Sequence, residues 1–178
     1  RSYPIEVKIL PCPQFAGGQP YAILLKAIRD VVHEKTGTDD IRLRAGVGMR
    51  FRETEEYIKR YELDKHYGPG KTKGVAPVDE GIPIETEVGT LYGIKAIYDA
   101  DWIIHAHHTD VREVHFHRQI DKAVKPFGMS YARIETRSTY HQNLGPRAAN
   151  FTARAIFESK FVQSKFAFGA FLNVGPHG

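Results

Sequence analysis

The chain of 178 residues contains a single cysteine, Cys12, and this scarcity excludes two kinds of structure. One cysteine cannot form a disulfide within the chain, nor supply the paired thiolates of a cysteine-based zinc cluster. Long apolar runs are also missing, because none approaches the 18 residues that a membrane-spanning helix needs. No signal peptide is visible at the start. We therefore expect a cytoplasmic protein that does not enter a membrane.

Charge of one sign is also scarce. The formal net charge is only +4, and no block of five or six like charges occurs. Such a mild positive excess suits a small anionic substrate and does not predict binding to nucleic acid. An apolar fraction of 42% and a charged fraction of 26% are ordinary for a globular protein, and the length suits one domain.

The hydrophobic pattern alternates between strands and helices along most of the chain. Period-two or short apolar runs predict strands at 5–10, 41–48, 82–88, 102–106, 130–136 and 166–174, the last of them buried. Helical spacing predicts helices at 21–35, 52–63, 114–124 and 146–161, and the glycine-containing segment 64–81 reads as a loop. This alternation predicts an α/β fold, a layered Rossmann-like domain with a mainly parallel sheet and helices on both faces.

Five of the nine histidines fall between residues 105 and 117, directly after the predicted strand 102–106. Ligands of α/β folds collect at the carboxyl ends of strands, so this cluster is the first candidate site. Three interpretations are open: a metal site, a proton-transfer site, or histidines that are simply packed or solvated. His105 and His107 point to one side of an extended chain and His108 to the other, so no face offers more than two imidazoles. We therefore expect one wall of an active site and not a complete metal cage.

Two other segments carry candidate residues. The stretch GPGKTKG at 68–74 lacks the spacing of a phosphate-binding loop and reads as a glycine-rich turn. Arg50, in GMRFR after the strand 41–48, could bind a carboxylate with its planar guanidinium group.

The order of several segments resembles the N-terminal domain of the lactate racemase (LarA-like) family, whose members use a nickel-pincer nucleotide. The resemblance lies in IRLRAGVGMRFRETEEYI, KHYGPGKTKGVAPVDEGIPIETEV, DADWII, DKAVKPFG, NLGPRAANF and FGAFLNV. It covers most of the chain. Two departures stand out, because the family's glycine-rich stretch before the cofactor lysine is absent and Arg112 stands where the family has a histidine.

The resemblance implies a set of roles. The reaction would be an isomerisation of a 2-hydroxy acid, in which a histidine removes the hydroxyl proton and the cofactor takes a hydride. Lys122 would hold the cofactor, and Arg50 and Arg112 would bind the substrate carboxylate. The catalytic histidines would be His66, His107 and His108. We also expect His66 and His108 to lie across one cleft, within about 10 Å of each other.

The sequence leaves two alternatives to this reaction open. One is an enzyme that holds nickel or zinc directly, with His105 and His141 among the ligands, and another is a non-catalytic domain that binds a small molecule. In each case we expect a small-molecule ligand and neither nucleic acid nor membrane as a partner, while the oligomeric state is open. The family's second domain has no counterpart in these 178 residues, which raises the expectation of a longer protein.

Overall fold

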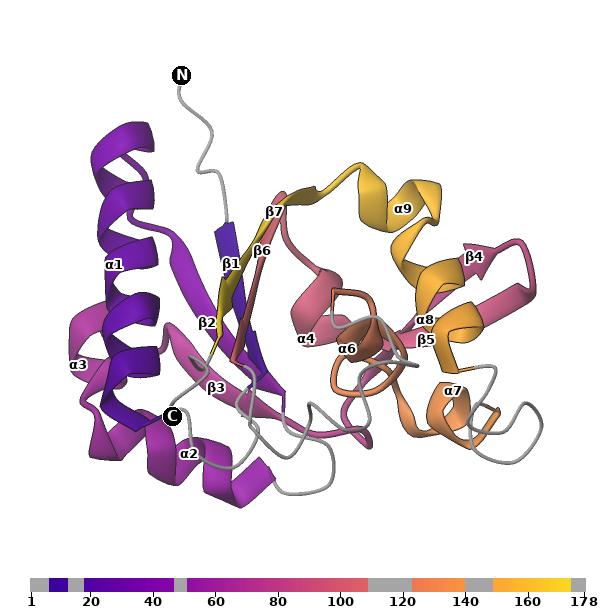
Figure 1. The fold of residues 1–178 in the computed structure, drawn as a ribbon, viewed down its shortest axis with the longest axis horizontal. Helices are drawn as coiled ribbons and strands as arrows, with labels where there is room; N and C mark the ends of the chain where they lie inside the picture. Colours follow the sequence, from indigo (N-terminus) through magenta and orange to yellow (C-terminus); the bar gives the residue numbers. More distant parts are fainter. Residues whose placement is uncertain (1–6, 13–17, 47–50, 109–122, 140–148, 174–178) are drawn as a thin grey trace.

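A computed structural model describes residues 7–12, 18–46, 51–108, 123–139 and 149–173 (Figure 1). Within these ranges the chain alternates between strands and helices, as the sequence predicts. The strands are β1 (Val7–Cys12), β2 (Ile41–Gly46), β3 (Thr72–Val75), β4 (Gly81–Thr86), β5 (Gly89–Ile94), β6 (Trp102–His108) and β7 (Phe166–Leu172). The helices are α1 (Gly18–Thr36), α2 (Phe51–Arg60), α3 (Leu63–Tyr67), α4 (Lys95–Tyr98), α6 (Lys125–Gly128), α7 (Ile134–Ser138), α8 (Ala149–Phe157) and α9 (Lys160–Gln163).

Five strands form one parallel sheet in the order β3-β2-β1-β6-β7. The chain builds outward from β1 to β3 in one direction, then returns to the other side of β1 and continues through β6 to β7. The direction of growth therefore reverses between β1 and β6. The two remaining strands, β4 and β5, form a separate antiparallel hairpin.

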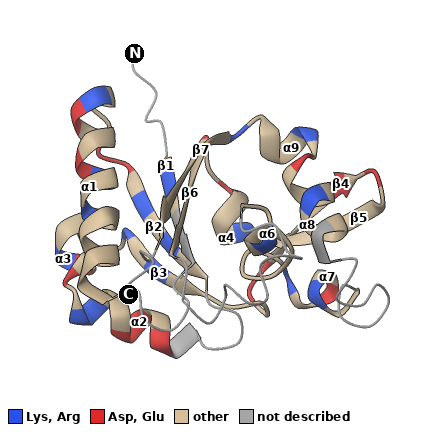
Figure 2. Ribbon diagram, in the orientation of Figure 1, with Lys and Arg blue, Asp and Glu red and all other residues tan. Residues whose placement is uncertain are grey.

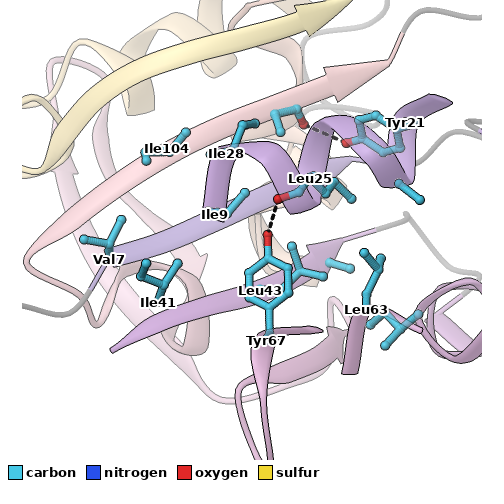
Figure 3. Close-up of a cluster of buried hydrophobic side chains, with 14 residues drawn as sticks. Val7, Ile9, Tyr21, Leu25, Ile28, Ile41, Leu43, Leu63, Tyr67 and Ile104 are labelled. Atoms are coloured by element: carbon cyan, nitrogen blue, oxygen red, sulfur yellow. Dashed lines mark hydrogen bonds between the residues drawn. The ribbon is translucent and has the colours of Figure 1, made fainter. Parts of the chain in front are cut away.

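Helices cover both faces of the sheet, which confirms the predicted α/β layered fold. On one face α1, α2 and α3 enclose a core with side chains of β1, β2 and β6 (Figure 3). On the other face α4, α6, α8, α9 and the β4–β5 hairpin gather around a second apolar cluster (Figure 1). No described helix is both long and apolar enough to cross a membrane.

Helix α1 shows how the local sequence produces this arrangement. Tyr21, Leu25 and Ile28 recur at helical spacing and are all buried against the sheet. The helix ends where Gly37 takes a positive φ of 69° and its N–H donates to the carbonyl of His33. Glycine adopts that backbone conformation without steric cost, so the predicted end of the helix is confirmed.

Several predicted elements differ from the structure. The segment 64–81 is not a loop throughout, because it contains most of α3 and all of β3. The predicted strand 130–136 is wrong: the chain makes one isolated bridge at Ala132 and then turns into α7. The hydroxyl of Thr136 both accepts from the N–H of Tyr92 and donates to its carbonyl, which ties this turn to β5. The predicted buried strand at 166–174 is β7, and it is an exposed edge strand.

Candidate functional site

Strand β6 brings three histidines to the point where the order of the sheet reverses. β6 lies between β1 and β7, and its apolar residues Ile103 and Ile104 are buried. His107 and His108 are the last two residues of this strand. In the ladder with β1, His107 lies beside Cys12, the last residue of β1. Ligands of doubly wound sheets bind outside the carboxyl ends of the strands at such a reversal. The fold therefore places these two histidines at its expected ligand-binding edge.

The three side chains of β6 divide between the two faces of the sheet. The rings of His105 and His107 lie 5.9 Å apart on the face that also carries Phe127. His108 lies on the opposite face, where its ring is 5.6 Å from the ring of Tyr21 on α1. The alternation expected for an extended chain is thus confirmed, because neighbouring residues of a strand point to opposite faces.

His105 is held by an aromatic cage. Its Nδ1 is 2.8 Å from the hydroxyl of Tyr131, and its ring meets those of Tyr131 and Phe171 nearly edge-on. Tyr131 is itself fixed by its backbone, since its N–H donates to Pro126 and its carbonyl accepts from Ile94. A tyrosine–imidazole hydrogen bond of this kind fixes the orientation of the ring. The ring of His105 therefore has a fixed orientation and forms part of the wall of the candidate site.

His107 and His108 lie nearer the end of the strand. His107 is buried, with its ring 6.2 Å from that of Phe171. His108 is also buried, and the Tyr21 beside it donates from its hydroxyl to the carbonyl of Ala106 at 3.1 Å. This bond attaches the first turn of α1 to β6, so α1 and β6 together hold the His108 side of the site.

The structure does not bring His66 to these histidines. His66 lies on α3, and its Nε2 is 2.9 Å from a carboxylate oxygen of Asp30 on α1. Asp30 follows Tyr21, the neighbour of His108, by nine residues, which is about 13 Å along a helix axis. His66 and His108 thus contact residues well separated along α1, and the structure gives no support to the expected pair across one cleft.

The reason lies in the folding of the segment expected to be a flexible loop. Tyr67 is fully buried beside α1, and its hydroxyl donates to the carbonyl of Leu25 at 2.7 Å. Leu63 is buried in the same core. These contacts pin α3 to α1 and hold His66 against Asp30, where the two form an ion pair when the imidazole is protonated.

Four other predicted site residues, Arg50, Arg112, Lys122 and His141, lie outside the described residues, as do His115 and His117. In the sequence, Arg50 comes four residues after the last residue of β2, and Arg112 comes four residues after the last residue of β6.

A direct metal site finds little support in the described part of the chain. No group of three or more His, Cys, Asp or Glu side chains there is arranged to hold a metal ion. His105 and His107 are the two imidazoles on one face, and Tyr131 already engages one nitrogen of His105. A metal site needs three or four converging donors.

Sequence reasoning missed the aromatic residues that hold these histidines. Tyr131 and Phe127 follow β6 by some twenty residues and have no spacing relation to His105. Tyr21 begins the predicted helix 21–35, and its position in the sequence does not relate it to His108. No local signal links these residues to the histidines, because packing across the sheet brings them together.

Comparison with known proteins adds no family to this geometry. A scan against family models finds none that matches the chain, and a search of curated proteins finds no relative.

Proposed function

We propose that this domain binds a small 2-hydroxy acid at the carboxyl edge between β1 and β6 and catalyses its isomerisation, in the manner of a divergent lactate racemase. One observation carries the proposal: the sheet order reverses at the place where β6 ends in His107 and His108. Substrate sites of doubly wound folds lie at this reversal. The resemblance of the sequence to lactate racemases supplies the class of substrate.

The chemistry of the two histidines suits this role. An imidazole changes its protonation near neutral pH, so one histidine can remove the α-proton from one face of the substrate while the other, in its protonated form, delivers a proton to the opposite face. His107 and His108 leave the strand on opposite faces. A substrate seated beyond the end of β6 would then meet one imidazole from each side, and a reaction that serves both faces of an α-carbon needs groups arranged in this way.

The substrate carboxylate would be bound by arginine. Arg50 and Arg112 lie on segments that follow the carboxyl ends of β2 and β6. A guanidinium group presents two parallel N–H donors that match a carboxylate. This assignment explains how a chain with a small net positive charge would select an anionic ligand.

The nickel-pincer nucleotide of the resembling family fits the described residues poorly. They contain no group of three or more His, Cys, Asp or Glu side chains that could hold a metal ion, and Tyr131 engages a nitrogen of His105. Lys122 and His141 lie outside the described ranges. The proposed reaction therefore does not depend on this group. The mass of the intact protein purified from its natural host tests whether Lys122 carries it, because a covalent nucleotide would add its mass to the 20.1 kDa of the chain.

The experiment that tests the proposal combines binding and turnover. Calorimetry with D- and L-lactate and related 2-hydroxy acids should show saturable binding, and chiral chromatography should show interconversion of the two enantiomers. His107→Gln and His108→Gln keep a polar side chain of similar size, and each should lower turnover by about a hundredfold. His33→Gln, at the far end of α1 from Tyr21, is the matched control and should leave turnover unchanged.

Two results would contradict the proposal. One is wild-type protein, proven folded and carrying whatever cofactor its host supplies, that binds no 2-hydroxy acid. The other is full activity in both the His107 and the His108 variants. Binding without turnover in the wild type would point instead to the non-catalytic alternative.

A further inference from the structure

The two edge strands of the parallel sheet differ in their protection. β3 has only four residues and carries the exposed Lys73. β7, at the other edge, has seven residues, Phe166–Leu172, and contains neither a charge nor a proline. Natural proteins guard sheet edges by short strands, charged side chains or proline, because an open edge pairs readily with another strand. β3 has two of these protections, whereas β7 has neither a charge nor a proline, and its ladder with β6 shifts register once, between Phe166 and Phe168.

β7 also exposes aromatic side chains on both of its faces. Phe168 pairs in register with Ile104, so its side chain lies on the same face of the sheet as α1. Phe168 is nevertheless 45% exposed. Phe171 pairs with His107 on the other face and is 40% exposed. Figure 2 shows β7 as an uncharged strand, whereas α1 and α2 carry many charges.

The apolar surface extends beyond β7. Trp102 begins the neighbouring strand β6 and is 45% exposed. It pairs in register with Val7, whose side chain lies in the core beneath α1, so Trp102 and Phe168 share a face. The exposed parts of Phe168, Phe171 and Trp102 amount to roughly 300 Å². That is a substantial part of the about 800 Å² that each partner of a stable complex buries.

We propose that β7 pairs with β7 of a second copy of this chain, antiparallel about a two-fold axis, and joins two five-stranded sheets into one of ten strands. An antiparallel ladder centred on Gly169 would pair the outward N–H and C=O groups at residues 168–170 of one copy with those of the other. The pairing is isologous and closes after two copies. β7 has no charge, so no like charges oppose each other across the axis, although each chain carries a net +4.

The sequence of β7 suits pairing with itself. A register with Gly169 on the axis sets Phe168 of each copy opposite Ala170 of the partner subunit, a large side chain against a small one. A strand with aromatic residues throughout would crowd at this axis. The small residues Gly169 and Ala170 therefore make the second copy the occupant that this edge fits best.

Multi-angle light scattering after size-exclusion chromatography tests the proposal. At roughly 100 μM, where an association of micromolar affinity is nearly complete, the wild-type chain should have twice its 20.1 kDa mass. Phe168→Lys places a charge beside the axis and should return the mass to that of one chain. Val78→Lys changes a residue that is 64% exposed between β3 and β4, and this control should remain dimeric.

Hydrogen exchange gives a second measurement that does not depend on how a variant folds. In the wild type, amides of β7 should exchange several-fold more slowly as the concentration rises, while those of β3 should not change. If Phe168→Lys is unfolded by circular dichroism, Phe171→Lys takes its place. A wild-type mass of one chain at every concentration, or a dimer that persists in a folded β7 variant, would overturn the proposal.

Discussion

Buried tyrosine hydroxyls show at single residues how burial and hydrogen bonding decide a side chain's contribution. Tyr67 and Tyr98 are both almost fully buried. The hydroxyl of Tyr67 donates to the carbonyl of Leu25 at 2.7 Å. The hydroxyl of Tyr98 has no hydrogen-bond partner among the residues that the structure describes. A buried polar group without a partner destabilises the folded state, because it has lost its water.

These two tyrosines give opposite predictions for the same substitution. Tyr98→Phe removes an unsatisfied hydroxyl and should leave the free energy of unfolding unchanged or raise it by up to about 1 kcal/mol. Tyr67→Phe removes a hydrogen bond and leaves the Leu25 carbonyl short of a donor, so it should lower that free energy by about 1 kcal/mol. Urea denaturation of both variants measures the difference. A Tyr98→Phe variant less stable than Tyr67→Phe would contradict this account.

Between elements, the carboxyl end of β2 lies unusually close to the chain that carries Tyr131. A Cβ atom added to Gly46 would meet the backbone carbonyl oxygen of Ser130 at 2.7 Å and the ring of Tyr131 at 3.4 Å. Tyr131 in turn bonds to His105 on β6. Gly46 therefore allows three separate elements to meet beneath the candidate site.

Gly46→Ala should disturb both stability and the site. The backbone carbonyl of Ser130 cannot move as a side chain would, so we expect a loss of about 1–3 kcal/mol in the free energy of unfolding. The displaced Tyr131 should also change the environment of His105, visible as a shift of its imidazole resonances in an NMR spectrum. Unchanged stability together with unchanged histidine resonances would show that this approach is not tight in solution.

Element by element, some parts of the fold follow from local pattern and others do not. The helix at 18–36 and the strands β1, β2 and β6 have a clear periodicity, and each was predicted within a few residues. The prediction of a strand at 130–136 is wrong because the alternating residues pack in a turn and not in a sheet. Tyr131 and Ala132 are buried against the second core, and Thr136 then binds the backbone of β5. The same alternation of apolar and polar residues is therefore compatible with a turn as well as with a strand.

At the scale of the whole molecule, two buried tyrosines and the partly buried Tyr57 couple folding to alkaline pH. Burial raises the pKa of Tyr57, Tyr67 and Tyr98 above the ordinary value, and for Tyr57 the nearby Tyr61 adds to the effect. The unfolded chain loses these protons near its ordinary pKa, at about pH 10, whereas the folded chain still holds them. Their contribution to stability is therefore complete below that pH and is lost as the pH rises toward the folded-state pKa.

We expect the urea midpoint of unfolding to fall between about pH 9 and pH 11. Tyr98→Phe removes one of the three groups and should make this fall shallower. Tyr92→Phe changes a tyrosine that is 40% exposed, and this control should leave the slope as it is in the wild type. If the midpoint of the wild type is constant over this range, tyrosine burial does not govern alkaline stability.

The sequence by itself determined the fold class and one part of the candidate site. Periodicity depends on nearest neighbours along the chain, so it gave the alternation of strands and helices and the division of His105 and His107 from His108. Only the tertiary structure decided the order β3-β2-β1-β6-β7, which sets His107 and His108 at the reversal. It also decided that His66 lies against Asp30 and that β7 is an edge. Such contacts join residues far apart in sequence through packing across the sheet, and no local pattern records which distant surfaces meet.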